Sequence, residues 1–374
     1  MEQQRSKMEN LVSLFEQLRN VYGGKKVFLT GHTGFKGSWL LKMLVLIGAD
    51  VKGYSLAPVT ADDHYCLLNG DLLCKSVIAD IRNREQLIAE ITGYNPDFIF
   101  HLAAQPLVRL SYEIPAETFA VNAIGTANVL DAMRLLNRPC FAVCITTDKV
   151  YHNNEWLYPY RESDMLGGFD PYSASKACSE LVIDSYRNSF FNTAAFQTHR
   201  KAVAVARAGN VIGGGDWAKD RLLPDIARAL GTGQTIIVRN PRAVRPWQHV
   251  LEPLAGYLRL GAALSQDPVA FSSAFNFGPL HNDAMTVEEM VKLAVIKWGE
   301  GAYEAVSSAD QPHEAGLLKL DISKARNLLH WEPEMTASDA VAATVEWYRL
   351  FYKDKNLTSL ITEQQILAFL LQAT

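Results

Sequence analysis

Short apolar runs alternate with helix-like segments over roughly the first 200 residues of the chain. The apolar runs lie at residues 27–29, 50–55, 76–80, 97–102, 141–145 and 203–207, and helical patterns occupy residues 38–48, 85–92, 116–136 and 170–189. Strands that alternate with helices are typical of βαβ units, in which crossover helices join parallel strands. The pattern therefore predicts an α/β fold: a doubly wound parallel sheet of the Rossmann type, with a smaller carboxyl-terminal lobe that binds substrate.

The same pattern divides the chain into three parts. Residues 25–206 hold the alternating strands and helices and form the predicted nucleotide-binding domain, which later segments can join. Residues 207–374 carry glycine-rich loops, a basic string at 239–245 and separate helices, and they are assigned mainly to the substrate-binding lobe. Residues 1–24 have apolar side chains at helical spacing, which predicts an amphipathic helical extension. The apolar positions are Met8, Leu11, Val12, Phe15 and Leu18.

A glycine-rich turn joins the first predicted strand to the first predicted helix. Residues 25–37 read KKVFLTGHTGFKG, so that the glycines follow a GxxGxxG spacing. In this arrangement the pyrophosphate of a dinucleotide binds the free N–H groups at the amino end of the helix, and glycine lets the backbone approach it closely. The sequence predicts a dinucleotide cradle at this turn. Its residues are Gly31, Thr33, Gly34, Phe35, Lys36 and Gly37.

Two further strand ends are predicted to contact the dinucleotide. The second strand ends at Ser55, where many NAD-binding folds carry an acid that holds the adenosine ribose. The sequence has no acid at this place and no arginine nearby to hold a 2′-phosphate, so NAD is favoured over NADP. The strand at 97–102 ends in small residues that would let a flat ring approach the backbone, although close packing would also explain them. These tip residues are Leu102, Ala103, Ala104 and Gln105.

A tyrosine and a lysine four residues apart form the first catalytic hypothesis. Tyr172 and Lys176 stand at the start of the helix at 170–189, and their spacing places both side chains on one helix face. Lowering a tyrosine pKa from about 10 to about 7 requires about 4 kcal/mol, which a nearby ammonium and a positive nicotinamide can supply. Lone pairs of this spacing are mostly accidents of surface helices, but this pair follows both a strand tip and the glycine turn.

Three polar residues after the strand at 141–145 form the second catalytic hypothesis. Thr147, Asp148 and Lys149 supply a hydroxyl, a carboxyl and an amine at the carboxyl end of a parallel strand, where ligands bind. These groups could bond a sugar 4-hydroxyl, donate a proton and accept one. Asp148 and Lys149 could equally form a solvated turn pair. The neighbourhood of Tyr172 favours the functional interpretation.

Composition excludes several classes of function. The chain has 374 residues, of which 48% are hydrophobic and 20% charged, as is typical of a globular protein. A net charge of -4 gives no argument for nucleic acid or an anionic membrane surface, and no apolar run reaches the roughly 18 residues that cross a bilayer. The five cysteines lack CxxC spacing, and the histidines lack metal-ligand spacing. We therefore expect no metal and a reducing, cytoplasmic location.

Motifs along most of the chain resemble one enzyme family. The segments are GHTGFKG, HLAAQPLVRLSY, TTDKVY, GFDPYSASK, RAGNVIGGGDW, RPWQHVLEPLAGY, NFGP and PHEAGLLKLD. Together they resemble the CDP-glucose 4,6-dehydratases, which are extended short-chain dehydrogenase/reductases, from about residue 24 to about residue 348. No single segment is specific, but the whole set is. The resemblance implies the Rossmann fold of that superfamily, NAD as cofactor and CDP-glucose as substrate.

The family's mechanism implies a role for each catalytic candidate. Tyr172, supported by Lys176, would remove the proton of the glucose 4-hydroxyl while hydride leaves C4 for NAD. The resulting ketone acidifies C5, and Lys149 would then remove the C5 proton while Asp148 protonates the departing 6-hydroxyl. Many sugar-nucleotide dehydratases carry glutamate in place of this lysine, and a neutral amine requires burial or a neighbouring cation to lower its pKa. The implied product is CDP-4-keto-6-deoxyglucose, for deoxysugar biosynthesis of the lipopolysaccharide type.

The resemblance also implies binding residues. Asp80 and Ile81 lie where the family contacts adenine, and Asn122 would support the site from the middle of the helix at 116–136. Arg221 and Arg245 lie where the family reaches phosphates and ribose. Five more residues could bond phosphate or sugar oxygens, and a structural role is equally open for the last three of them. They are Asn210, Asn276, Gln105, Arg109 and His313.

Other functions compete with this interpretation. An NDP-sugar 4-epimerase would share Tyr172, Lys176 and NAD, but it has no use for an acid and base such as Asp148 and Lys149. A dehydratase for another NDP-glucose stays open, because the residues alone do not fix the base preference. A non-catalytic NAD-binding scaffold would not need the catalytic residues at all. By analogy with relatives, the helices at 116–136 and 172–189 could form the interface of a homodimer or homotetramer.

Overall fold

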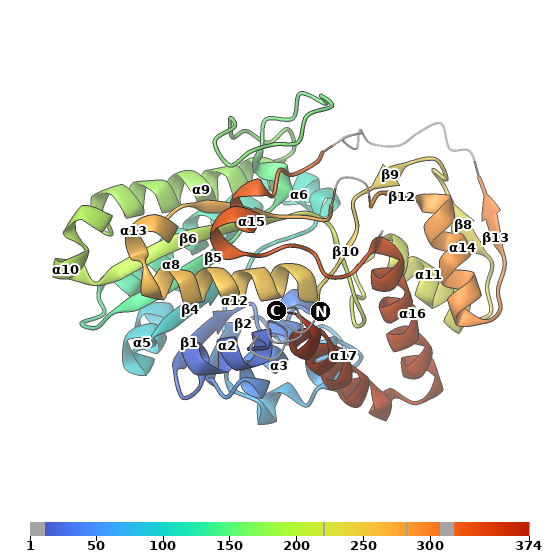
Figure 1. Cartoon of the computed structure of the whole chain (residues 1–374), viewed down its shortest axis with the longest axis horizontal. Coiled ribbons are helices and arrows are strands. Elements are labelled where there is room, and N and C mark those ends of the chain that lie inside the picture. The colour runs from blue at the N-terminus through green and yellow to red at the C-terminus, as the bar shows by residue number, and fades with distance from the viewer. Residues whose placement is uncertain (1–11, 220, 281–282, 307–317, 374) are drawn as a thin grey trace, which may run out of the picture.

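The computed structural model describes residues 12–219, 221–280, 283–306 and 318–373. Seven parallel strands form one sheet in the order β11-β6-β5-β4-β1-β2-β3, with helices on both faces, so the predicted Rossmann fold is confirmed (Figure 1). The chain order reverses direction at β1, and such a switch point opens a ligand crevice at the carboxyl ends of the strands. The strands are β1 Lys26–Thr30, β2 Asp50–Ser55, β3 Lys75–Ile78, β4 Phe98–His101, β5 Cys140–Ile145, β6 Lys201–Ala208 and β11 Ala274–Phe277.

The seventh strand of the sheet comes from the carboxyl-terminal half of the chain. β11 pairs with β6, and this register sets Asn276 beside Arg207. The other six strands coincide with the apolar runs of the sequence to within two residues at either end. β11 follows the pattern of a buried strand as well, but it lies far along the chain, among segments assigned to the second lobe. The main sheet therefore includes residues beyond 206.

Alternate residues of the strands build two separate apolar layers. In β6, Ala202, Ala204 and Ala206 join the layer that holds helices α3 (Phe35–Leu46) and α12 (Leu251–Gln266). Val203 and Val205 face the opposite layer, which is built with α5 (Arg84–Tyr94), α8 (Gly125–Arg134) and α9 (Pro171–Ser189). All eight residues of β6 are buried, as expected for a central strand that is covered on both faces.

The helix predicted at 116–136 is interrupted in the structure. It consists of α7 (Pro115–Phe119), a π-helical turn, η2 (Ala120–Ile124), and α8. A π turn widens a helix by one residue and is common at functional sites. Here the turn carries Asn122, whose backbone carbonyl accepts hydrogen bonds from the hydroxyls of Thr126 and Ser179. A period of 3.6 in the apolar pattern does not reveal such a widening, so the sequence predicted one continuous helix.

The helix of the amino-terminal extension is an integral part of the apolar layer on the α12 face. α2 (Leu14–Tyr22) buries Leu14, Leu18 and Tyr22, and the Tyr22 hydroxyl donates a 2.7 Å hydrogen bond to the Leu258 carbonyl of α12. It also packs against α17 (Thr358–Gln372), so that both ends of the described chain meet (Figure 1). Of the positions predicted to form the apolar face, Leu18 is buried and Val12 is exposed. Met8 and Leu11 lie outside the described residues.

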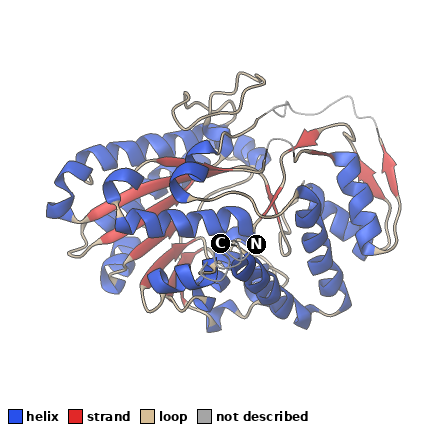
Figure 2. Cartoon of the chain, in the orientation of Figure 1, coloured by secondary structure: helices blue, strands red, loops and turns tan. Residues whose placement is uncertain are grey.

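A smaller lobe packs beside the carboxyl ends of the strands. Its core lies between α11 (Leu222–Gly231), α14 (Val287–Trp298) and α16 (Ala337–Lys353), and its short strands stand apart from the main sheet (Figure 2). No helix among the described residues is long and apolar enough to span a membrane. The remaining elements are α4 His64–Leu67, η1 Gly70–Leu72, α6 Val108–Glu113, η3 Asp148–Val150, η4 Thr193–Ala195, α10 Phe196–His199, β7 Val211–Ile212, β8 Ile236–Val238, β9 Val244–Arg245, β10 Gln248–His249, α13 Pro268–Phe271, β12 Met285–Thr286, β13 Tyr303–Ala305, α15 Ser323–Leu329 and η5 Lys355–Leu357.

Candidate active site

The glycine turn between β1 and α3 is packed too closely to admit side chains. A Cβ atom at Gly37 would lie 1.9 Å from the Gly31 carbonyl oxygen, and one at Gly31 would lie 2.8 Å from the Ala103 nitrogen. Gly31 also has a φ of 77°, in the left-handed region that favours glycine. No side chain caps the amino end of α3, where Gly34 is the N-cap. The backbone N–H groups at this end therefore suit the pyrophosphate of a dinucleotide.

Hydroxyl groups join the glycine turn to the end of β2. The Thr33 hydroxyl lies 2.8 Å from that of Ser55 and donates a 2.9 Å hydrogen bond to the Leu56 carbonyl. Beyond the next strand, the Asp80 carboxylate accepts hydrogen bonds from the backbone and guanidinium of Arg82, and these bonds lower its pKa. The Asp80 side chain is thus held within its own turn, and a contact with adenine at this place would fall to the backbone or to Ile81.

A buried polar relay fixes the end of β4. The backbone nitrogens of Leu102 and Ala103 both donate to the Thr30 hydroxyl at 3.1 Å, and this hydroxyl bonds to Nδ1 of His101 at 2.8 Å. Burial lowers the pKa of His101 to about 3, so its ring is neutral. Asn122 then accepts from the Gln105 nitrogen at 2.9 Å and donates to its carbonyl at 3.1 Å. These bonds hold residues 102–105 rigidly beside the glycine turn.

Helix α9 begins with a set of hydrogen bonds that orient Tyr172. Its N-cap, Asp170, accepts from the Ser173 nitrogen at 2.9 Å and from the Ser173 hydroxyl at 2.6 Å. The Tyr172 nitrogen donates to the Ser111 hydroxyl oxygen at 3.1 Å. One turn further on, the Lys176 ammonium donates a 3.1 Å hydrogen bond to the Ile145 carbonyl at the end of β5. Tyr172 and Lys176 are both buried, and the helix holds them next to the strand tip.

The residues after β5 place a buried carboxyl beside an amine. The Thr147 hydroxyl donates a 2.9 Å hydrogen bond to Oδ1 of Asp148, and its oxygen accepts a 3.4 Å hydrogen bond from the backbone N–H of Lys149. Asp148 is only 5% exposed, whereas Lys149 is half-buried. Burial raises the pKa of Asp148, and the positive charges of Lys149 and Lys36 act in the opposite direction. On the other side, a Cβ atom at Gly209 would lie 3.3 Å from Oδ2 of Asp148.

Burial and neighbouring groups act in opposite directions on the pKa of Tyr172. Burial raises the pKa of Tyr172 to about 12, while the Thr147 hydroxyl and the positive charge of Arg221 act to lower it. A cationic contribution from Lys176 to the Tyr172 phenolate stays a prediction, and Arg221 of the second lobe adds a further positive charge beside the phenol. Burial also lowers the pKa of both Lys176 and Lys36 to about 8.

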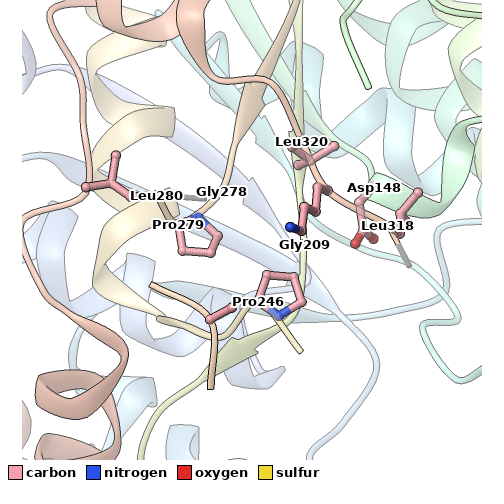
Figure 3. A pocket seen from close by; sticks show the side chains of 10 residues that line it. Asp148, Gly209, Pro246, Gly278, Pro279, Leu280, Leu318 and Leu320 are labelled. Carbon is pink, nitrogen blue, oxygen red and sulfur yellow. The ribbon is translucent and has the colours of Figure 1, made fainter. Parts of the chain in front are cut away.

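A small cavity of about 20 Å³ opens next to the Asp148 carboxyl (Figure 3). It lies between the sheet edge and loops of the second lobe, and apolar side chains form most of its wall (Figure 3). It is lined by Asp148, Gly209, Pro246, Gly278, Pro279, Leu280, Ala284, Leu318, Lys319 and Leu320. Its wall is largely apolar and includes the Asp148 carboxyl, and its volume is well below the roughly 300–1,000 Å³ of a typical ligand pocket.

Known proteins that are similar to this chain are enzymes of nucleotide sugars. A family model described as GDP-mannose 4,6 dehydratase matches residues 28–344. A CDP-glucose 4,6-dehydratase from Salmonella typhimurium is 47% identical over 339 residues, which cover 91% of this chain and 94% of the relative. The chain belongs to the GDP-mannose 4,6 dehydratase family. The resemblance inferred from the sequence motifs is thereby confirmed.

Other relatives of this family member are more distant. A CDP-paratose 2-epimerase from Salmonella typhi is 27% identical over 340 residues, which cover 86% of this chain and 98% of the relative. The crystal structure of DesIV, a dTDP-glucose 4,6-dehydratase from Streptomyces venezuelae with NAD bound, superimposes with a TM-score of 0.72. That superposition covers 90% of this chain and 99% of DesIV at 23% sequence identity, and it supports the fold.

Two residues that were predicted to contact substrate instead bond to other parts of the protein. The Asn276 side chain is fully buried and donates to the carbonyls of Tyr160 and Asp321, at 3.0 and 3.1 Å. The Gln105 side-chain amide likewise forms hydrogen bonds with the backbone of Leu107 and the hydroxyl of Thr118. These partners favour structural roles for both amides, because a polar group that is buried and fully bonded has little left to offer a ligand.

The other residues predicted to contact substrate lie at the rim of the site, except for one that is outside the described residues. Arg221, at the start of α11, donates a 2.7 Å hydrogen bond to Asp216, and Asn210 is exposed after β6. Arg109 is exposed on α6. The backbone of Arg245 lies in β9, where it pairs with β12. His313 lies outside the described residues.

Sequence reasoning missed an ion pair directly behind the candidate catalytic residues. Glu180 and Arg207 are both buried, and the Arg207 Nε atom donates to Oε1 of Glu180 at 2.8 Å. Two signals could have found them. Glu180 continues the spacing of four from Tyr172 through Lys176, and Arg207 is the single charged residue in the apolar segment VAVARAG.

Replacing Gly37 by alanine tests the cradle at the glycine turn. Because the new Cβ would meet a backbone carbonyl at 1.9 Å, the turn must shift, and we expect the dissociation constant for NAD to rise by about tenfold or more. Gly93→Ala on α5 is the matched control, since its Cβ has open space within 4 Å. Calorimetric titration of NAD into both folded variants measures the effect. Equal affinity in the two variants would remove the turn from the cofactor site.

Proposed function

We propose that the chain is a CDP-glucose 4,6-dehydratase, which converts CDP-glucose to CDP-4-keto-6-deoxyglucose and water. The observation that carries the proposal is the buried Asp148 carboxyl, which is followed by Lys149 directly after β5. Helix α9 brings Tyr172 and Lys176 to the same end of β5. The 47% identity to a CDP-glucose 4,6-dehydratase supports the choice of nucleotide. NAD is the cofactor that fits the glycine turn; when bound, it accepts hydride from C4 of the glucose and returns it to C6.

Tyr172 is the proposed base of the oxidation step. Its phenolate would take the proton of the 4-hydroxyl while the C4 hydrogen leaves as hydride. The Thr147 hydroxyl and the Arg221 charge favour this phenolate, whereas burial opposes it. Removing the phenol from water also strengthens each of these favourable interactions. Lys176 lies one turn further along α9, and its hydrogen bond to the Ile145 carbonyl fixes the position of its ammonium group.

Asp148 and Lys149 are the proposed acid and base of the elimination step. The Lys149 amine would take the C5 proton, the C5–H electron pair would form the new double bond, and the C6–O6 bond would break. Asp148 would give its proton to O6, which leaves as water. A buried carboxyl with a raised pKa retains a proton to higher pH than an exposed one, which suits a proton donor. Gly209 presents no side chain to Oδ2 of Asp148, on the side away from the Thr147 hydroxyl.

An NDP-sugar 4-epimerase is the nearest alternative, and the strand tip argues against it. An epimerase reaction returns hydride to the same carbon and breaks no C–O bond. It therefore has no use for a buried proton donor at Asp148 or for an amine at Lys149.

Incubation with CDP-glucose tests the proposed function directly. We expect the purified chain to convert CDP-glucose to a product that develops the ultraviolet absorbance of a 4-keto-6-deoxy sugar in alkali, with no net consumption of NAD. UDP-glucose and dTDP-glucose, run in parallel, measure the nucleotide preference. An alkali-silent galactose isomer of the substrate would identify an epimerase, and unchanged CDP-glucose would contradict both activities.

Lys149→Met should separate the two proton transfers. The variant keeps Tyr172, Lys176 and the glycine turn, so we expect it to oxidise CDP-glucose and to accumulate reduced cofactor. It lacks the amine, so exchange of the C5 hydrogen with deuterated solvent should fall by about 100-fold or more, the usual size of a general-base contribution. Mass spectrometry of recovered sugar measures the exchange. Exchange at the wild-type rate would exclude Lys149 as the C5 base.

We also propose that the enzyme is a homodimer or a dimer of dimers, built through α8 and α9. Apolar side chains on these helices and on the adjoining π turn are exposed, and neighbouring apolar side chains of this kind mark protein interfaces. They are Ile124, Leu135, Leu181 and Phe190. The five free cysteines fit a reducing cytoplasm, and the proposed product belongs to deoxysugar biosynthesis of the lipopolysaccharide type.

Leu181→Arg tests this interface. Leu181 on α9 is 60% exposed in the single chain, and a charge at the centre of an apolar contact should dissociate the dimer to monomers. Leu371→Arg on α17 is the control, because Leu371 is similarly exposed, at 57%, on another helix. Analytical ultracentrifugation gives the masses. A Leu181→Arg variant with the mass of the control variant would place any interface elsewhere.

A further inference from the structure

The ion pair between Glu180 and Arg207 lies directly behind the catalytic residues. The two side chains are 3% and 4% exposed, and Arg207 Nε donates to both carboxylate oxygens of Glu180, at 2.8 and 3.0 Å. Glu180 stands on α9, one turn after Lys176, and Arg207 stands on β6. The pair therefore joins the helix that carries the catalytic tyrosine to the strand next to β5.

Hydrogen bonds from this pair reach both sides of the Thr147–Asp148–Lys149 segment. Before the segment, the Thr146 hydroxyl donates to Oε1 of Glu180 at 2.7 Å. After it, Nη1 of Arg207 donates to the Tyr151 hydroxyl at 2.7 Å, and the guanidinium lies 4.8 Å from the centre of the Tyr151 ring. Tyr151 in turn donates to Oδ1 of the buried Asn276 at 2.7 Å. The segment is thus held at residues 146 and 151.

Stability alone does not account for this network. Removing two charges from water costs nearly as much as their attraction returns, and apolar residues of the same volume often serve as well. A fully bonded polar network instead fixes one arrangement of the parts it joins. Here the joined parts are helix α9 and the loop that carries the proposed acid and base.

We propose that Glu180, Arg207 and Tyr151 are positioning residues for the elimination step. The inference rests on the proposed dehydratase function. Oxidation requires Tyr172 and Lys176, whose positions are set separately by Asp170, Ser111 and the Ile145 carbonyl. Elimination also requires the acid and base of the 147–149 segment in register with the sugar, and only this segment depends on the network at both of its ends. Loosening the network slows elimination more than oxidation, so reduced cofactor accumulates during turnover.

Tyr151→Phe removes the hydroxyl that joins Arg207 to Asn276 and keeps the buried ring. We expect kcat with CDP-glucose to fall about 10-fold at nearly unchanged KM, since small displacements of catalytic groups have effects of this size or larger. We also expect a several-fold larger fraction of reduced cofactor in the steady state. Tyr22→Phe is the matched control, because Tyr22 is equally buried and its hydroxyl donates a 2.7 Å hydrogen bond far from the site.

A second variant and a direct measurement of the 146–151 segment distinguish lost positioning from a general loss of stability. Thr146→Val removes the bond to Glu180 at the other end of the segment and should give the same accumulation of reduced cofactor. Hydrogen–deuterium exchange of the peptide that spans residues 146–151, without substrate, should be faster in both variants than in wild type and in Tyr22→Phe.

The result that overturns the proposal is equally specific. If Tyr151→Phe and Thr146→Val match Tyr22→Phe in steady-state reduced cofactor and in exchange of this peptide, the network has no positioning role. Wild-type turnover of CDP-glucose is measured in the same series. Its absence would reject the dehydratase function itself, whereas normal wild-type turnover with unaltered variants rejects only the positioning role.

Discussion

The contact between the end of β5 and helix α9 holds the candidate site together. Lys176 donates to the last carbonyl of the strand, and Thr146 donates to Glu180 on the same helix. Because the parallel register sets the β4 and β5 ends level, this contact also fixes the helix relative to the glycine turn beside β4. Groups from distant parts of the sequence are thereby fixed within one crevice before any ligand arrives, which is the arrangement that rate enhancement by orientation requires.

Burial gives the ionisable groups of the site the properties that dehydration needs. It raises the pKa of Asp148, as the proposed proton donor requires, and it lowers the pKa of Lys36 and Lys176 to about 8. The same burial raises the pKa of Tyr172, which disfavours a phenolate base, whereas Thr147 and Arg221 act to lower that pKa. Arg221 belongs to the second lobe, so the two lobes share the electrostatics of the oxidation step as well as the walls of the cavity.

The sequence predicted the parts of this protein that depend on local patterns. Buried parallel strands appear as apolar runs, and the close backbone approach at Gly31 and Gly37 leaves a readable glycine spacing. Contacts between distant segments leave no such signal. The buried bonds of Asn276, the pairing of Glu180 with Arg207 and the docking of α2 on α12 each depend on the assembled fold. The Asn276 amide was therefore assigned to substrate, although the fold uses it to anchor Tyr151.

The fate of the hydrogen at C4 of the substrate tests the central claim most directly. In the proposed reaction, oxidation at C4, loss of water across C5 and C6, and return of hydride to C6 all occur within one site. CDP-glucose deuterated at C4 should therefore give a product with deuterium at C6, detected by nuclear magnetic resonance. Deuterium that stays at C4, or that is lost to the solvent, would contradict a site in which Tyr172, Asp148 and Lys149 act on a single sugar.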